Sequence, residues 1–152
     1  MTSPRLIVAV DPGFDGAIAF LRDGRELEVH DMPCLELTRN SKAKRQLNYH
    51  EIGRMFDNAH DADGLWIESV NARPGQGVSS MFAFGKSTGA IIGAAAAQFW
   101  RISEVPPATW RKAVGLKTGD GKDASQRWRS TIFQGMPSFS PGRRMRAERR
   151  LR

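Results

Sequence analysis

Two acidic residues, Asp11 and Glu68, each stand directly after a short apolar run. Such runs are typical of strands buried on both faces, so each acid is expected at the end of a strand. If the two strands are neighbours in one sheet, both acids emerge at the same edge and can share a cation. Mg²⁺ prefers carboxylate oxygens, and two such ions about 3.5–4 Å apart assist phosphodiester hydrolysis. The pair therefore indicates metal-dependent phosphodiester chemistry.

A simpler interpretation exists for each acid, in which it only caps a strand or a turn. Asp11 precedes Pro12-Gly13, and aspartate is common in turns, so alone it would be read that way. Glu68 follows Leu-Trp-Ile, a run expected in the core, where an acid needs a partner or a metal. Glu68 therefore carries more of the argument than Asp11.

The elements that would position these acids have a mixed α/β order. Strands are predicted at residues 5–10, 16–21, 27–31, 65–67 and 101–105. Asp23-Gly24 is a strong hairpin signal, so the first three strands should form an antiparallel meander. Helices are predicted after an N-cap at Asn48 and over residues 80–99, 106–114 and 122–133. Residues 33–46 are polar and basic without periodicity, and are predicted to be a loop.

Composition fits one domain without a membrane segment. At 152 residues the chain is within the range of about 100–200 residues for a single core. It has no apolar run of about 20 residues and no secretory pattern, and its single cysteine, Cys34, excludes an internal disulfide. A cytoplasmic protein, in a bacterial cell or a phage-infected host, is expected.

The net charge of +7 is unevenly distributed. Residues 142–152 contain six arginines and one glutamate, so most of the excess positive charge lies in that tail. A polyanionic partner is compatible with this distribution, but the remainder of the chain does not require one.

Several segments in order along the chain carry a family resemblance. They are Ile-Val-Ala-Val-Asp-Pro-Gly at 7–13, Trp-Ile-Glu at 66–68, Arg-Pro-Gly-Gln-Gly-Val-Ser-Ser-Met-Phe-Ala-Phe-Gly-Lys-Ser at 73–87, Pro-Ala-Thr-Trp-Arg-Lys at 107–112 and Lys-Asp-Ala-Ser at 122–125. Over roughly residues 5–137 the sequence resembles the RuvC-type Holliday junction resolvases, particularly their phage branch. The resemblance implies an RNase H-like fold: a five-stranded mixed sheet, its first three strands antiparallel, flanked by helices.

The end of the chain departs from the family pattern. The family closes with a helix that brings further acids, and Arg146-Ala147-Glu148 resembles that stretch, so Glu148 is expected as a third ligand. Residues 143–145 are Arg-Arg-Met where the family has an Asp. We therefore expect a nuclease domain over residues 1–140 and a truncated or divergent Arg-rich tail over residues 141–152.

Three residues are expected to contact DNA. Arg73 and Gln76 lie in a glycine-rich loop after Glu68, where backbone can approach a phosphate and both side chains can bond phosphate or base edges. Lys122 opens a predicted helix whose N-terminus attracts phosphate. The alternatives are an ordinary glycine-rich loop and a solvated lysine.

Together these features predict a crossover junction endodeoxyribonuclease. Asp11, Glu68 and Glu148 would hold Mg²⁺ or Mn²⁺, and an activated water would attack the phosphodiester in line. Symmetric cleavage of a four-way junction needs two sites related by a two-fold axis, which implies a homodimer. Two rivals remain: a catalytically impaired, structure-selective DNA binder with this fold, and an RNase H-like nuclease for RNA–DNA hybrids.

Overall fold

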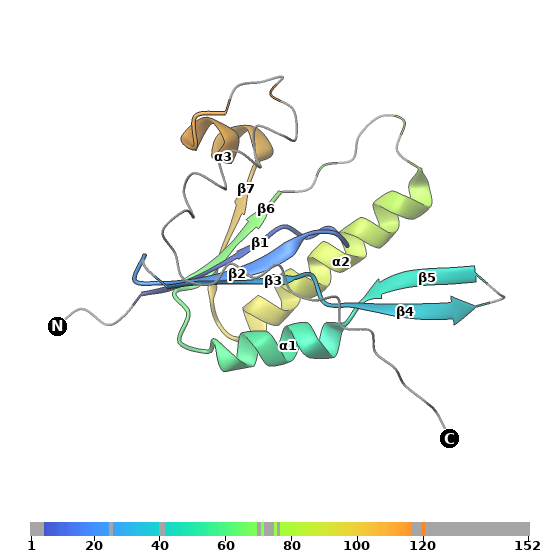
Figure 1. The fold of residues 1–152 in the computed structure, drawn as a ribbon, viewed down its shortest axis with the longest axis horizontal. Coiled ribbons are helices and arrows are strands. Elements are labelled where there is room, and N and C mark those ends of the chain that lie inside the picture. Colours follow the sequence, from blue (N-terminus) through green and yellow to red (C-terminus); the bar gives the residue numbers. More distant parts are fainter. Residues whose placement is uncertain are drawn as a thin grey trace.

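The computed structural model describes residues 5–24, 26–39, 42–69, 71, 75, 77–116 and 120 (Figure 1). The predicted helix at 122–133, the domain limit at 140 and the Arg-rich tail lie outside these residues. None of the described helices has both the length and the apolar composition that a membrane-spanning helix needs.

Five strands form one mixed sheet in the order β3-β2-β1-β6-β7. Their bounds are β1 Leu6–Val10, β2 Ala17–Arg22, β3 Glu26–Asp31, β6 Gly64–Glu68 and β7 Arg101–Val105. β2 is antiparallel to β1 and to β3, whereas β6 is parallel to β1 and to β7. The predicted five-stranded mixed sheet with an antiparallel start is confirmed. At the β2–β3 turn, Asp23 and Gly24 both have positive φ, a conformation that aspartate and glycine adopt more readily than most residues.

The prediction of a loop over residues 33–46 is wrong. This segment forms a second, two-stranded sheet from β4 Cys34–Arg39 and β5 Lys42–Leu47, paired antiparallel from Cys34 opposite Leu47 to Arg39 opposite Lys42. The hairpin lies apart from the five-stranded sheet and points away from it (Figure 1). Apolar periodicity could not reveal it, because most of its side chains are polar and do not form a buried face.

Three helices complete the described fold: α1 Tyr49–Asn58, α2 Val78–Ala97 and α3 Pro107–Ala113. Asn48 caps α1 as predicted, since its side chain accepts a hydrogen bond from the backbone N–H of Glu51. One side of α1 is apolar and faces the core, with Ile52 2% and Phe56 0% exposed. α2 begins two residues earlier than predicted and ends two residues earlier.

The core lies between one face of the five-stranded sheet and the layer formed by α1 and α2 (Figure 1). Every second side chain of β1 and single or alternate side chains of β2 and β6 are buried in this core: Leu6, Val8, Val10, Ile18, Leu65 and Ile67. On the opposite face the described side chains are less enclosed, and Ala9 is exposed. Since strand side chains alternate, the residue after Val10 and the residue after Ile67 belong to this second face.

Candidate active site

Asp11 follows β1 and enters a tight turn back to β2. Its backbone N–H donates to the carbonyl oxygen of Ala17 at 3.0 Å, and its Oδ1 accepts from the N–H of Gly13 at 3.3 Å. A Cβ on Gly16 would lie 2.1 Å from the carbonyl oxygen of Asp11, so only glycine fits there without displacement of the backbone. The turn holds the Asp11 backbone tightly, while its side chain is exposed.

Glu68 is the last residue of β6 and is half-buried. Its Oε2 accepts a hydrogen bond from the indole Nε1–H of Trp110 on α3 at 3.1 Å. The expectation that this acid needs a partner is therefore met by a side chain 42 positions away along the chain. Such a charge-assisted bond restricts the orientation of the carboxylate.

Trp110 is the residue in this site that sequence reasoning missed, since no role was predicted for it. It is half-buried, and the Arg111 guanidinium lies 6.0 Å from the centre of its ring. Trp110 lies in Pro-Ala-Thr-Trp-Arg-Lys, one of the segments that resemble the resolvases, but nothing local to that segment specifies a contact with Glu68. Only the parallel pairing of β6 with β7, which leads into α3, brings them together.

The sheet brings Asp11 and Glu68 to the same edge. The register of the parallel pair β1–β6 runs from Ile7 opposite Gly64 to Val10 opposite Ile67, so Asp11 and Glu68 occupy the next pair of positions. Neighbouring strands are about 4.8 Å apart, and both positions belong to the face away from the core. Two carboxylates so placed suit a hard divalent cation.

The remaining predicted site residues, Arg73, Gln76, Lys122 and Glu148, lie outside the described residues. Within the described ranges, no group of three or more His, Cys, Asp and Glu side chains could hold a metal. His30, beside Asp31 at a strand end, has its Nε2 2.6 Å from Glu28 Oε1 and makes an edge-on contact with Phe20. Neither contact is a metal-site arrangement.

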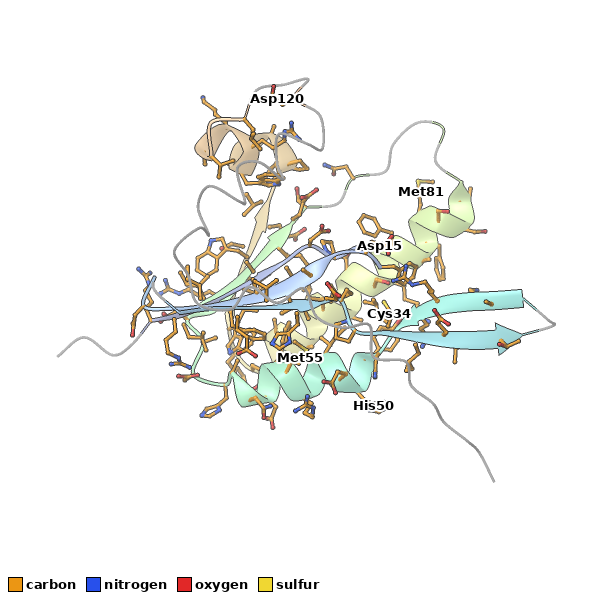
Figure 2. The ribbon with its side chains drawn as sticks, viewed as in Figure 1. Asp15, Cys34, His50, Met55, Met81 and Asp120 are labelled. Carbon is orange, nitrogen blue, oxygen red and sulfur yellow. The ribbon has the colours of Figure 1, made fainter. Side chains whose placement is uncertain are left out.

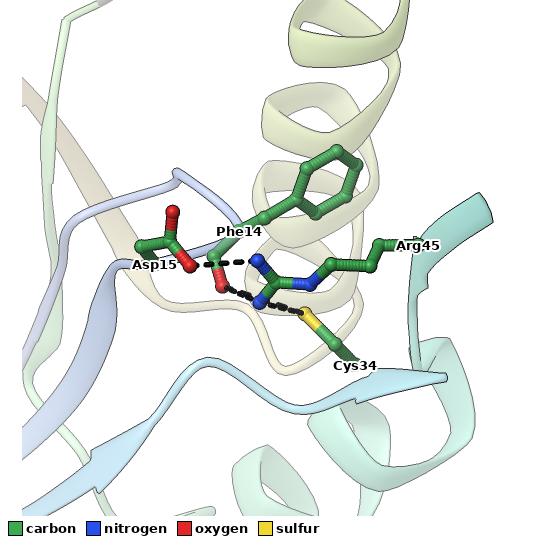
Figure 3. Close-up of polar contacts among 4 residues, drawn as sticks. All are labelled: Phe14, Asp15, Cys34 and Arg45. Atoms are coloured by element: carbon green, nitrogen blue, oxygen red, sulfur yellow. Dashed lines mark hydrogen bonds and ion pairs between the residues drawn. The ribbon is translucent and has the colours of Figure 1, made fainter. Parts of the chain in front are cut away.

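A clamp connects the Asp11 turn to the β4–β5 hairpin. The Arg45 guanidinium donates to Asp15 Oδ1 at 2.6 Å, to the carbonyl oxygen of Phe14 at 2.6 Å and to Cys34 Sγ at 3.8 Å (Figure 3). Figure 2 places Asp15 and Cys34 close to the base of the hairpin. The loop that begins at Asp11 is therefore fixed to the hairpin within four residues of the acid.

The charge states of Cys34 and Arg45 indicate that the clamp has a structural rather than a catalytic role. Burial raises the pKa of the Cys34 thiol, and the nearby Arg45 charge only partly opposes this effect. The thiol is therefore neutral at pH 7 and unsuited to act as a nucleophile. The hydrogen bond to Asp15 raises the pKa of Arg45, which keeps its positive charge.

Comparison with known proteins supports the fold but does not assign a family. The sequence matches no protein-family profile and no curated protein. The Thermus thermophilus RuvC structure is similar in fold, with a TM-score of 0.53, 13% identity and coverage of 91% of this chain and 84% of that one. T. thermophilus RuvC in complex with a Holliday junction substrate gives a TM-score of 0.47, 12% identity and coverage of 86% and 94%. The chain thus has a RuvC-like, RNase H-like fold.

Proposed function

We propose that this chain is a divalent-metal-dependent endonuclease that cuts DNA at four-way junctions, of the phage RuvC type. One observation carries the proposal: Asp11 and Glu68 end adjacent parallel strands of a RuvC-like sheet, on the face away from the core. The motifs at residues 73–87 and 107–112, which resemble the resolvases, support the same activity.

Asp11 and Glu68 would hold Mg²⁺ or Mn²⁺, together with Glu148 from the C-terminal segment. Bound there, the ion would polarise the scissile phosphate and lower the pKa of water. Asp11 provides an exposed carboxylate on a backbone fixed by the Gly13–Gly16 turn. Trp110 holds Glu68 in one orientation, which limits the reorganisation that ligation would need.

DNA contacts and assembly complete the proposal. Arg73, Gln76 and Lys122 would bind phosphates or base edges near the cut. Paired incisions would require a homodimer. α2 is a candidate for the dimer contact, because its glycines 85, 89 and 93 are exposed at a spacing of four residues and would allow close helix approach.

A second candidate is a junction-binding protein that has lost catalysis. It is favoured by Arg143, Arg144 and Met145, which stand where the resolvases have an additional acid. In this case the fold and DNA contacts would be retained, while Asp11 and Glu68 would hold metal too weakly for cleavage.

Cleavage assays on three labelled substrates separate these functions. The full chain is incubated with Mg²⁺ or Mn²⁺ and a four-way junction, a linear duplex or an RNA–DNA hybrid. We expect symmetric cuts in the junction alone, and an Asp11→Asn variant that binds the junction but does not cut it. Preferential cutting of the hybrid would contradict junction specificity. Selective junction binding without cleavage by either metal would establish the binder instead.

A further inference from the structure

The turn that carries Asp11, residues 11–16, contains two glycines, Gly13 and Gly16, whose backbone can adopt more conformations than that of other residues. One hydrogen bond closes the turn, from the N–H of Gly16 to the carbonyl oxygen of Gly13 at 3.0 Å. The carboxylate of Asp11 depends on the same shape, because its Oδ1 accepts from the N–H of Gly13 at 3.3 Å. A change in the turn would therefore move this carboxylate.

Arg45 holds the outer part of the turn from the neighbouring hairpin (Figure 3). Its Nη1 donates to Asp15 Oδ1 and its Nη2 to the carbonyl oxygen of Phe14, each at 2.6 Å. The guanidinium also lies 5.7 Å from the centre of the Phe14 ring, and Phe14 packs against the core. One rigid, planar group thus binds two successive residues of the turn.

Arg45 itself has a defined position, because the base of the hairpin is attached to the body. Leu47 follows two residues later in β5, lies on the same face and is 1% exposed. The N–H of Asn48 donates to the carbonyl oxygen of Pro33 at 2.8 Å and closes the base. Cys34, opposite Leu47 in the register, accepts a further bond from Arg45 at 3.8 Å. The turn is thus connected to the fixed base of the hairpin.

The charge of Arg45 does not explain its place beside the acids. Its guanidinium is already paired with the Asp15 carboxylate at 2.6 Å and bonded to the Phe14 carbonyl oxygen, so a contact with a DNA phosphate would have to compete with these bonds. Near a metal bound at Asp11, a positive charge would by itself oppose the cation. The geometry of its bonds therefore accounts for Arg45 better than its charge does.

We infer that Arg45 is a positioning residue for the metal site, because its bonds hold the turn in the shape that presents the Asp11 carboxylate beside Glu68. The inference rests on the proposed function and gives the β4–β5 hairpin a part in metal binding that no motif indicated. Without these bonds the turn adopts other conformations for part of the time. The apparent metal affinity then falls in proportion to the fraction of molecules in which the turn has the binding conformation.

The test measures Mn²⁺ binding to the full chain by electron paramagnetic resonance, without DNA. Arg45→Gln removes the guanidinium, and we expect it to bind Mn²⁺ about three- to tenfold more weakly, a smaller loss than for a direct partner of a ligand. Arg22→Gln is the matched control, since it breaks an ion pair with Asp61 at the other end of β2. The sign is decisive, because loss of a positive charge alone would strengthen the binding of a cation.

Two further measurements separate positioning from a general effect on structure. In the Asp11→Asn background, Arg45→Gln should not weaken Mn²⁺ binding further, because Arg45 acts through Asp11, and an equal loss there contradicts the inference. Amide hydrogen exchange at Gly13 and Gly16 should become faster in Arg45→Gln and stay unchanged in Arg22→Gln. Unchanged exchange at both glycines overturns the inference, and so does Mn²⁺ binding by Arg45→Gln that equals or exceeds that of the wild type.

The two proposals can fail separately. A wild-type chain that binds Mn²⁺ and cuts junctions, with equal Mn²⁺ affinity in Arg45→Gln, contradicts only the positioning role. Mn²⁺ binding that depends on Arg45, without junction cleavage in Mg²⁺ or Mn²⁺, contradicts only the nuclease activity. A wild-type chain that binds no Mn²⁺ contradicts both.

Discussion

The five-stranded sheet and the β4–β5 hairpin are both built from paired strands, yet they are stabilised differently. The sheet places one face against α1 and α2, where Val8 and Ile67 are fully buried. The hairpin buries only its base, at Leu47, while Leu37 further out is 44% exposed. A strand needs a buried face to show apolar alternation, so the sheet could be predicted from sequence and the hairpin could not.

The two regions also differ in what they contribute: the sheet stabilises the fold, whereas the hairpin adds little to its stability. The sheet and its helices supply the core, whose burial stabilises the fold. The hairpin adds little apolar burial, and its place depends on a few polar contacts around Arg45 and Asp15. Substitutions in the sheet should change the free energy of unfolding, whereas substitutions in the hairpin should change its local order.

The largest contrast is expected between two apolar truncations. Phe56 on α1 is 0% exposed and packs against Trp100 with ring centres 4.9 Å apart. Phe56→Ala should lower the free energy of unfolding by about 3–5 kcal/mol. Leu37→Ala in the hairpin should change it by less than about 0.5 kcal/mol. Urea unfolding measures both, and equal losses would contradict the contrast.

A smaller effect is expected at the turn between Asp11 and the hairpin. Gly16→Ala places a Cβ against the Asp11 carbonyl oxygen, so the backbone must move, at a cost of about 1–3 kcal/mol. Gly53→Ala on α1 meets no atom within 4 Å and should stabilise the protein by about 0.5–1 kcal/mol. Thermal unfolding checks both signs. If Gly16→Ala proves as stable as Gly53→Ala, the turn is not constrained as described.

Sequence reasoning recovered the elements with apolar periodicity and missed those defined by long-range contacts. The antiparallel start of the sheet and the Asn48 cap follow from local patterns. The pairing of β1 with β6, which brings Asp11 and Glu68 to one edge, was only a condition of the two-acid argument, because no local pattern specifies it. The Trp110–Glu68 bond could not be found, because it joins residues 42 positions apart that have no shared local signal. The contacts of Arg45 with Phe14 and Asp15 could not be predicted either, because they also join residues far apart in the sequence.

The Trp110 contact should matter for activity more than for stability. Trp110→Phe retains the aromatic ring but removes the donor to Glu68, so we expect cleavage or metal affinity to fall by about 10–100-fold. Trp100→Phe is the matched control: among the described residues the Trp100 Nε1–H is buried without a hydrogen-bond partner. Cleavage rates over a range of Mg²⁺ concentrations compare the two. Equal activity of both variants would remove Trp110 from the site.

The smallest effect is expected for the clamp. The Arg45 side chain is 43% exposed and that of Asp15 is 91% exposed, so solvent screening limits the loss on Arg45→Gln to less than about 1 kcal/mol. Amide hydrogen exchange should nevertheless become faster in β4 and β5 and stay unchanged in β1 and β6. Arg54→Gln, which breaks the ion pair with Glu51 inside α1, is the control. Unchanged hairpin exchange would show that the clamp does not order the hairpin.

Binding of Mn²⁺ tests the central claim, that Asp11 and Glu68 form one metal site at the sheet edge, most directly. Free Mn²⁺ is followed by electron paramagnetic resonance during titration of the full chain and of Asp11→Asn, Glu68→Gln and Asp57→Asn. Asp57 is an exposed acid on α1 and serves as the control. We predict binding by the wild type and the control, and an affinity at least about tenfold lower for either site variant. Wild-type affinity in both site variants would contradict the claim.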